Sequence, residues 1–367
     1  MSLLFYLLYF GIDTTPRQWY YSDMIKELNN FSDKLLFNLE KRQQEILAGR
    51  FGFKDGEEKT LQAIGDQMGI TRERVRQIEE HGLKELKSVL IKEEKKELAK
   101  LIEPTKKYLV SSGGLRRDDF LIQDLKRLTA QENWPKFFDH KLRFLFTLGG
   151  EPKFFEADDE FYDFWYLDEE IKNKAFKKIK EFFDFCQKAG PEKIINQKIH
   201  LARFQNLMNS NYLSLSKKFS VNVFGDFGLS FWSEINPKVI RDKAYLVLKK
   251  NNQPLHFRDV AQEINNFRFD YKKAHSQTVH NELIRDSRFV LVGRGIYGLR
   301  ELGYEPGTAR EVLVRILKKH GPLPSQKIIQ LVRQERFLRE NTILLNLQNK
   351  RYFQRLPDNR YTLIREA

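Results

Sequence analysis

The sequence predicts a mainly α-helical protein, in which a helix-turn-helix is followed by tandem winged-helix units with small β-hairpin wings. Three observations support this fold class. Residues 60–88 have the spacing of two helices joined by a tight turn, a block of residues near the C-terminus recurs after 64 positions, and each copy of that block ends in two short apolar strands. Within each copy the hydrophobic period changes from about 3.6 to about 2, which indicates helices followed by a hairpin.

The helix-turn-helix prediction rests on the residues that begin and end the two helices. Thr60 and Thr71 each precede an apolar helical pattern and have the hydroxyl that an N-cap needs, and Gly69 suits the left-handed position between the helices. Together, Gly65 and Gly69 predict a close crossing of the two helices. The packed face of the second helix is expected to consist of Val75, Ile78, Gly82 and Leu86.

The opposite face of the second helix carries four polar side chains near its N-terminal end: Arg72, Glu73, Arg76 and Gln77. Helix-turn-helix proteins place this end of the second helix in the major groove of DNA. There arginine can bridge guanine O6 and N7, glutamate can accept a hydrogen bond from cytosine N4, and glutamine can pair with adenine. These residues are predicted to read bases, with Arg74 beside them on phosphate. The alternative is a charged helical hairpin whose polar face is only solvated.

Residues 39–87 resemble region 4 of the bacterial housekeeping sigma factors along their whole length. The matching pieces are "EIL…RFG", "DGE", "TL…IG" and "GITRERVRQIE". The resemblance implies that this module reads a −35 promoter element, with Arg76 at the edge between bases and phosphates and Thr71 and Arg74 on phosphates. Only 38 residues precede it, too few for the aromatic-rich helical region that opens the −10 element in that family. A complete sigma factor is therefore not expected.

In that family the same module also docks on the flap of RNA polymerase through the apolar surface of its first helices. The residues here that match such a surface are Leu39, Ile46, Leu47 and Phe51. The resemblance implies a polymerase-docking role for them, and plain core packing is the alternative.

The C-terminal repeat predicts two winged helices, residues 236–302 and 304–367. Six residues recur 64 positions later, namely Thr278, Val279, Leu283, Phe289, Tyr297 and Leu299 as Thr342, Ile343, Leu347, Phe353, Tyr361 and Leu363. Fixed spacing over this length indicates duplicated units. The 236–302 unit resembles the HARE-HTH winged helix, a family that includes the δ subunit of some bacterial RNA polymerases and modules attached to chromatin and restriction proteins.

Weaker copies are predicted at residues 97–168 and 169–235. In these copies Trp165 and Trp232 are matched, loosely, to the tyrosine of the clearer wings. Residues 91–100 are interpreted as a solvated helix that connects the first module to the next. Residues 1–38 form an N-terminal extension of uncertain fold.

The charge is concentrated in the C-terminal third. The formal net charge is +14, and residues 235–367 have 26 lysines and arginines against 13 acidic residues, whereas residues 39–88 have 10 of each. Such asymmetry favours a polyanionic partner, most often nucleic acid, and a basic surface kept for solubility is the alternative. Lys272, Lys273 and Arg294 are predicted to contact DNA phosphates. In the last copy the comparable cations are Arg336, Arg339, Lys350, Arg351 and Arg360.

The sequence contains no recognisable catalytic, cofactor-binding or metal-binding pattern. "GRGIYG", residues 293–298, resembles a dinucleotide motif but is expected inside a hairpin, where that motif does not function. The single cysteine and seven scattered histidines do not predict a zinc site, and the single cysteine indicates a reducing interior. The apolar first ten residues are too few to span a bilayer. Neither a small-molecule substrate nor a membrane partner is expected.

These observations predict a cytoplasmic bacterial transcription factor without enzymatic activity. Its expected partners are double-stranded DNA and RNA polymerase core. Two alternatives remain open, an RNA polymerase-docking accessory protein similar to the δ subunit, and a non-catalytic subunit of a defence system.

Overall fold

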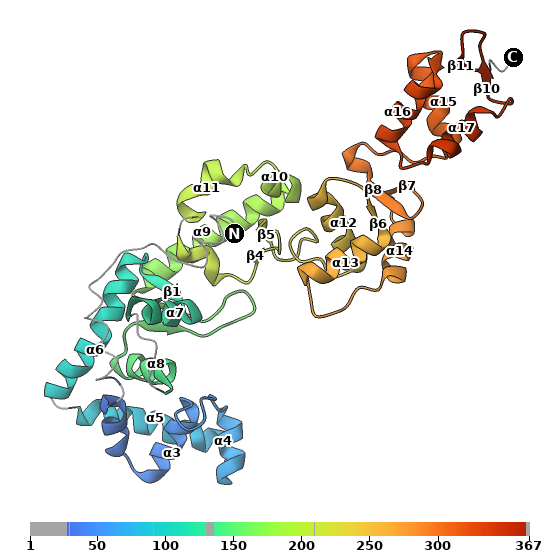
Figure 1. The fold of residues 1–367 in the computed structure, drawn as a ribbon. Helices are drawn as coiled ribbons and strands as arrows, with labels where there is room; N and C mark the ends of the chain where they lie inside the picture. Colours follow the sequence, from blue (N-terminus) through green and yellow to red (C-terminus); the bar gives the residue numbers. More distant parts are fainter. Residues whose placement is uncertain (1–27, 29, 91, 130–135, 209, 365–367) are drawn as a thin grey trace. The chain divides into compact units, whose positions relative to one another are not determined.

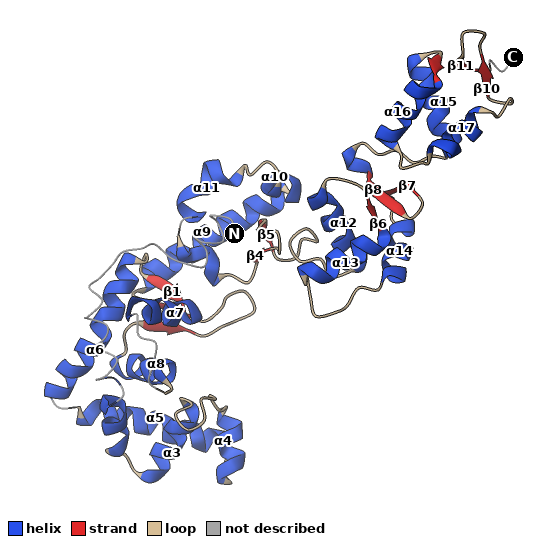
Figure 2. Cartoon of the chain, in the orientation of Figure 1, coloured by secondary structure: helices blue, strands red, loops and turns tan. Residues whose placement is uncertain are grey.

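The structure is a computed structural model that describes residues 28, 30–90, 92–129, 136–208 and 210–364, so most of the expected N-terminal extension lies outside the described residues. The chain separates into two compact units, Met1–Ser220 with Phe227–Ser230, and Val221–Asp226 with Phe231–Ala367. Each consists of helices with small antiparallel sheets (Figures 1 and 2). The predicted fold class is confirmed. None of the described helices is both long and apolar enough to cross a bilayer.

The first unit begins with the predicted helix-turn-helix. Its helices are α3 (Lys41–Arg50), α4 (Leu61–Met68) and α5 (Arg72–Val89). The residues predicted to pack on α5, at positions 75, 78, 82 and 86, are buried. A small core between the three helices consists of Ile46, Ile64, Val75 and Ile78.

A winged helix follows in the same unit. Its elements are α6 (Lys92–Ser111), β1 (Leu115–Arg117), α7 (Asp118–Thr129), α8 (Phe138–Gly149), β2 (Lys153–Phe155) and β3 (Phe164–Tyr166), with the sheet order β1-β3-β2. The segment interpreted as a solvated connection is continuous with the first helix of this module. It is not wholly solvated, because Leu98 is 5% exposed and Glu94 is 8% exposed.

The next elements of the first unit pack around a cluster of stacked aromatic rings. They are α9 (Glu169–Ala189), α10 (Pro191–Ile195), α11 (His200–Met208), the 3₁₀ turn η1 (Asn211–Leu215), β4 (Phe219–Val221) and β5 (Phe227–Leu229), and β4 pairs only with β5. The ring of Phe182 stacks on Phe219 at 5.3 Å and on Phe227 at 6.0 Å between centroids. Trp232 follows β5 in a turn, so its loose match to a wing tyrosine is wrong.

The second unit contains two winged helices in succession. The first has α12 (Ile240–Asn251), β6 (Leu255–His256), α13 (Phe257–Phe267), α14 (Ser276–Arg285), β7 (Phe289–Gly293), β8 (Ile296–Leu299) and the 3₁₀ turn η2 (Arg300–Leu302). The second has α15 (Ala309–His320), β9 (Leu323–Pro324), α16 (Ser325–Glu335), α17 (Glu340–Leu347), β10 (Phe353–Arg355) and β11 (Arg360–Leu363). Their sheet orders are equivalent, β6-β8-β7 and β9-β11-β10.

Strand register shows which residues of the modules are equivalent. Phe289 lies opposite Leu299, and Phe353 lies opposite Leu363, so residues related by the 64-residue repeat pair in the same way in both hairpins. A leucine opposite a tyrosine recurs three times: Leu115 with Tyr166, Leu255 with Tyr297, and Leu323 with Tyr361. The wing tyrosine of the 92–167 module is therefore Tyr166 and not Trp165. Successive strand residues point to opposite faces, and Trp165 instead packs on Phe146 and donates to Asp118.

The helix-turn-helix and the winged helix after it share one hydrophobic core. The rings of Phe51 and Phe53 lie edge-on to Phe144 of α8, with centroids 5.2 and 5.5 Å apart. Beside them, Arg143 of α8 donates to Glu58 at 2.8 Å. Leu39, Leu47 and Leu86 of the helix-turn-helix lie in one buried cluster with residues of α6, α7 and α8, beside the separate small core of α3, α4 and α5. The two modules are thus one packed body, although the sequence divides them at about residue 90.

Candidate nucleic-acid interface

Backbone caps fix the geometry of the turn between α4 and α5. The hydroxyl oxygen of Thr60 accepts a hydrogen bond from the Ala63 amide at 3.1 Å, and that of Thr71 accepts one from the Arg74 amide at 3.2 Å. Gly69 has a φ of 65°, in the left-handed region that glycine tolerates. These three features confirm the caps and turn expected from the sequence, and they hold the N-terminal end of α5 at the surface.

Gly65 is required by the turn and not by a helix crossing. A Cβ added at this position would lie 2.6 Å from the carbonyl oxygen of Ile70, whereas one added at Gly69 would meet nothing within 4 Å. The close approach of helices occurs instead at Gly82 of α5, where a Cβ would lie 3.4 Å from Leu47 of α3. The predicted crossing at Gly65 and Gly69 is therefore wrong.

Replacing Gly65 by alanine is expected to destabilise the helix-turn-helix by about 1–3 kcal/mol, because the new methyl group overlaps the Ile70 carbonyl. Hydrogen exchange of residues 61–78 in the full chain measures the effect. The exposed Gln67 on the same helix provides the control, and Gln67→Ala should change stability by less than about 0.5 kcal/mol. Equal protection in the two variants would contradict the clash.

The four predicted base-reading residues lie together on the exposed face of α5. The guanidinium of Arg76 donates to Glu73 at 2.7 and 2.9 Å and also pairs with Glu80. The hydrogen bond from Arg76 lowers the pKa of Glu73, and the same contact raises the pKa of Arg76. Both side chains are charged at neutral pH and form an ion pair with each other. Arg76 must therefore break its contact with Glu73 before it can contact a base.

Arg72 differs from Arg76 in its surroundings. Within the described part of the chain its side chain makes no hydrogen bond or ion pair, so it can contact a base without first breaking a contact. Arg74 donates to the side-chain oxygen of Gln77 at 3.2 Å, which orients the amide. Sequence reasoning omitted Glu80, although its position four residues after Arg76 is the signal for a helical ion pair.

The residues matched to a polymerase-docking surface lie mostly inside the molecule. Leu39, Ile46 and Leu47 are at most 5% exposed. Phe51 is half-buried against Phe144 of the following winged helix. The expectation that these four side chains offer a docking surface fails in this structure, because the chain's own α8 and the core cover them.

The predicted phosphate contacts of the second unit lie in a loop and a wing. Lys272 and Lys273 are exposed in the loop before α14, and Arg294 is exposed in the turn between β7 and β8. Across the described ranges, none of these three side chains forms a hydrogen bond or an ion pair. The glycine motif "GRGIYG" forms this same hairpin turn, as expected, and therefore lacks the helix that a dinucleotide site needs.

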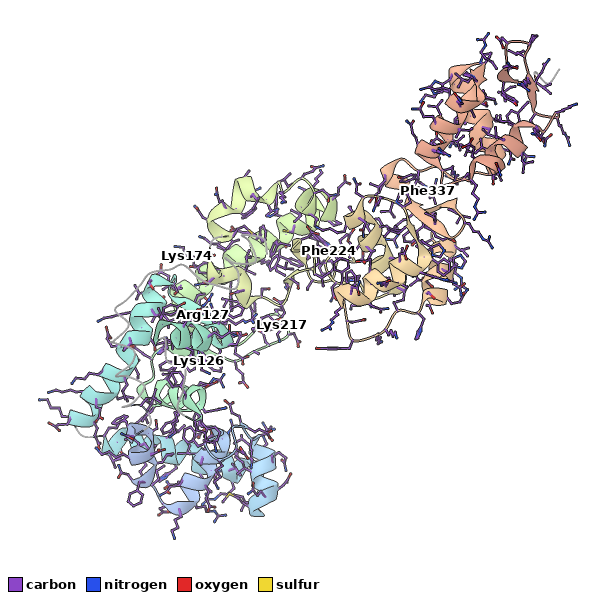
Figure 3. All side chains as sticks on the ribbon, in the orientation of Figure 1. Lys126, Arg127, Lys174, Lys217, Phe224 and Phe337 are labelled. Carbon is purple, nitrogen blue, oxygen red and sulfur yellow. The ribbon has the colours of Figure 1, made fainter. Side chains whose placement is uncertain are left out.

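The structure contradicts the prediction that Arg336 is one of the phosphate-contacting cations of the last copy. Its side chain is 4% exposed, and its guanidinium donates to the backbone carbonyls of Leu291, Glu305 and Gly307. It is unavailable to phosphate and holds the last winged helix against the wing of the preceding one. Next to it, the Phe337 amide donates to the Val292 carbonyl at 2.8 Å (Phe337 is labelled in Figure 3).

Metal binding has no candidate site within the described ranges. They contain no group of three or more His, Cys, Asp or Glu side chains arranged to hold a metal ion. Cys186 is buried in α9, and burial raises the pKa of its thiol to about 12.

Comparison with known proteins bears on the helix-turn-helix. Residues 35–88 match the family model described as Sigma-70, region 4. This segment is similar to region 4 of the sigma-70 family. The chain is 47% identical over 66 residues to RNA polymerase sigma factor sigB of Arabidopsis thaliana, and the match covers 18% of this chain and 12% of that protein. The chain is also 51% identical over 55 residues to RNA polymerase principal sigma factor HrdD of Streptomyces griseus, and this match covers 15% of this chain and 17% of that protein.

The likeness to sigma factors is confined to a small share of each protein. The HrdD protein of Streptomyces coelicolor is 47% identical over 57 residues, which is 16% of this chain and 17% of that relative. The chain thus spans less than a fifth of the length of these curated relatives. The likeness of residues 236–302 to HARE-HTH winged helices stays a prediction.

Proposed function

We propose that this protein is a cytoplasmic, sequence-specific DNA-binding transcription factor that reads a −35-like element through the major groove. The observation that carries the proposal is the exposed polar face at the capped N-terminal end of α5, in a segment that matches Sigma-70, region 4. Arg72, Glu73, Arg76 and Gln77 contact bases, and Thr71 and Arg74 contact phosphates. The protein acts by binding double-stranded DNA and has no catalytic role.

The nonspecific part of the affinity comes from the winged helices. The region 4 module has equal numbers of basic and acidic residues, whereas residues 235–367 have a net charge of +13. Lys272, Lys273 and Arg294 provide phosphate contacts that fix position without reading sequence. The region 4 module specifies the site, and the basic modules increase the time spent on DNA.

Selection of bound duplexes from a random pool tests this proposal. The wild type is expected to enrich a defined sequence, and Arg72→Ala with Gln77→Ala to lose about 1–3 kcal/mol of discrimination for each bidentate contact removed. The variants should keep their fold, because both side chains are exposed.

A matched variant separates base reading from phosphate contact. Lys272→Ala with Lys273→Ala should weaken binding to all duplexes equally and reduce the salt dependence by about one unit of slope per lost contact. Binding without preference for any duplex, unchanged in Arg72→Ala with Gln77→Ala, would refute the proposed function.

Docking on RNA polymerase core is the second candidate. The observation that favours it is the match to region 4 and to relatives named RNA polymerase sigma factors. Because Leu39, Ile46 and Leu47 are buried, docking requires other residues of the module. Co-purification with polymerase that survives nuclease treatment would support this function, and loss of the polymerase after nuclease would leave DNA binding as the function.

A further inference from the structure

The loop between α13 and α14 presents one aromatic ring to solvent. The relative exposure of Tyr271 is 109%, so both faces of its ring are in water. The neighbouring rings behave differently. Phe267 and Phe269 pack on Phe224, with centroids 4.7 and 5.7 Å away (Phe224 is labelled in Figure 3). Only the tyrosine of this aromatic loop is turned outward.

Specific contacts hold the loop in this shape. Lys243 of α12 is 2% exposed in its side chain, and its ammonium donates to Asp270 at 2.6 Å. The other carboxylate oxygen of Asp270 accepts a hydrogen bond from the Lys272 amide at 3.1 Å. Asn265 both donates to the Ala274 carbonyl, at 3.0 Å, and accepts from the Ala274 amide, at 2.8 Å. The exposure of Tyr271 follows from a built loop and not from a frayed one.

The surface around Tyr271 is cationic. Arg268, Lys272 and Lys273 are exposed, and none of their side chains has a hydrogen-bond or ion-pair partner among the described residues. The one acidic residue of the loop, Asp270, is neutralised from inside by Lys243. A hollow lined in part by Asn265, Arg268 and Tyr271 lies at this surface. An uncovered ring is therefore combined with three cations available to phosphate.

We propose that this loop, residues 268–273, binds an unpaired nucleobase, with Tyr271 stacked on the base and Arg268, Lys272 and Lys273 on the flanking phosphates. The proposal rests on the proposed function only in taking nucleic acid as the partner. Stacking needs an open base face, which single strands offer and paired, stacked duplex covers. A protein partner would instead require a contiguous apolar patch, and here a single ring is surrounded by positive charge.

Fluorescence anisotropy with the full chain and labelled 20-nucleotide oligothymidine, oligouridine and duplex DNA tests the proposal. Tyr271→Ala is expected to weaken binding of a single strand about 5- to 150-fold, from a stacking loss of about 1–3 kcal/mol, and to leave duplex affinity within about twofold. Tyr271→Phe keeps the ring and should restore binding. The comparison of thymidine with uridine strands shows whether the strand is DNA or RNA.

Two outcomes would overturn the proposal. In the first, Tyr271→Ala binds single strands like the wild type while Lys272→Ala with Lys273→Ala does not, which means that the loop is only electrostatic. In the second, Tyr271→Ala loses single strand and duplex equally. Failure of this proposal can be told apart from failure of the proposed function. The proposed function is tested on duplex DNA with Arg72→Ala and Gln77→Ala, whereas this proposal is tested on single strands with Tyr271→Ala.

Discussion

Replacing Arg336 by alanine is expected to lower the stability of the last winged helix by about 3 kcal/mol and to loosen its contact with the preceding wing. The guanidinium donates to three backbone carbonyls that belong to β7 and to the segment before α15. Its removal leaves those oxygens without their buried donor. Protection of the Phe337 amide, which donates to Val292, should fall in hydrogen exchange, and the thermal midpoint should decrease.

Arg339 provides the matched control for this experiment. It lies three residues further along the same connection, carries the same charge and is exposed. Arg339→Ala should change stability by less than about 0.5 kcal/mol. Arg336→Lys tests the geometry, because a single ammonium cannot reproduce the planar fork of a guanidinium. If the alanine variants at 336 and 339 unfold alike, the buried hydrogen bonds do not stabilise the contact.

Asp124→Ala is expected to lower the free energy of unfolding by about 3–5 kcal/mol, because it leaves the buried guanidinium of Arg116 without its carboxylate partner. Arg116 of β1 is completely buried, and its guanidinium donates to Asp124 at 2.7 Å and to Asn211 at 2.7 Å. Tyr108 also donates to Asp124, at 2.6 Å, and burial followed by the nearby carboxylate raises the pKa of Tyr108, so the phenol stays protonated. Thermal unfolding of the full chain measures the loss.

Asp119, a carboxylate at the surface five residues before Asp124, is the control that distinguishes the effect of burial from the effect of charge. Asp119 pairs with Arg117 and is half exposed, so Asp119→Ala should cost less than about 1 kcal/mol. The double variant Arg116→Met with Asp124→Leu removes both charges and should recover most of the stability. If Asp119→Ala and Asp124→Ala lower the stability equally, the buried Arg116–Asp124 pair contributes no more than an exposed ion pair.

The sequence predicted most of what local chemistry determines. Caps at Thr60 and Thr71 and the left-handed Gly69 follow from short-range rules, and the structure contains each of them. The 64-residue repeat identified equivalent residues of the two hairpins, and Phe289 pairs with Leu299 as Phe353 pairs with Leu363. The exposed face of α5 also followed from helical spacing.

What the sequence could not predict depends on contacts between modules. Arg336 has the same charge as its exposed neighbours, and only the wing packed against it decides that it is buried. Phe51 matches a docking surface by position, and Phe144 of α8 packs against it. Trp165 and Tyr166 are adjacent aromatic residues, so choosing the wing equivalent required the strand register. The base-reading and phosphate roles stay predictions.

The shared core of region 4 and α8 has a consequence for biosynthesis. Phe51 and Phe53 pack on Phe144, which leaves the ribosome well after the region 4 module has been synthesised. At about 5–20 residues per second, the interval lasts roughly 3–12 s. During that time Phe51 and Phe53 of the nascent chain lack the ring that packs on them in the complete structure. Synthesis of α8 therefore completes the packing around these two rings, and a nascent chain that stalls near residue 90 leaves them without Phe144.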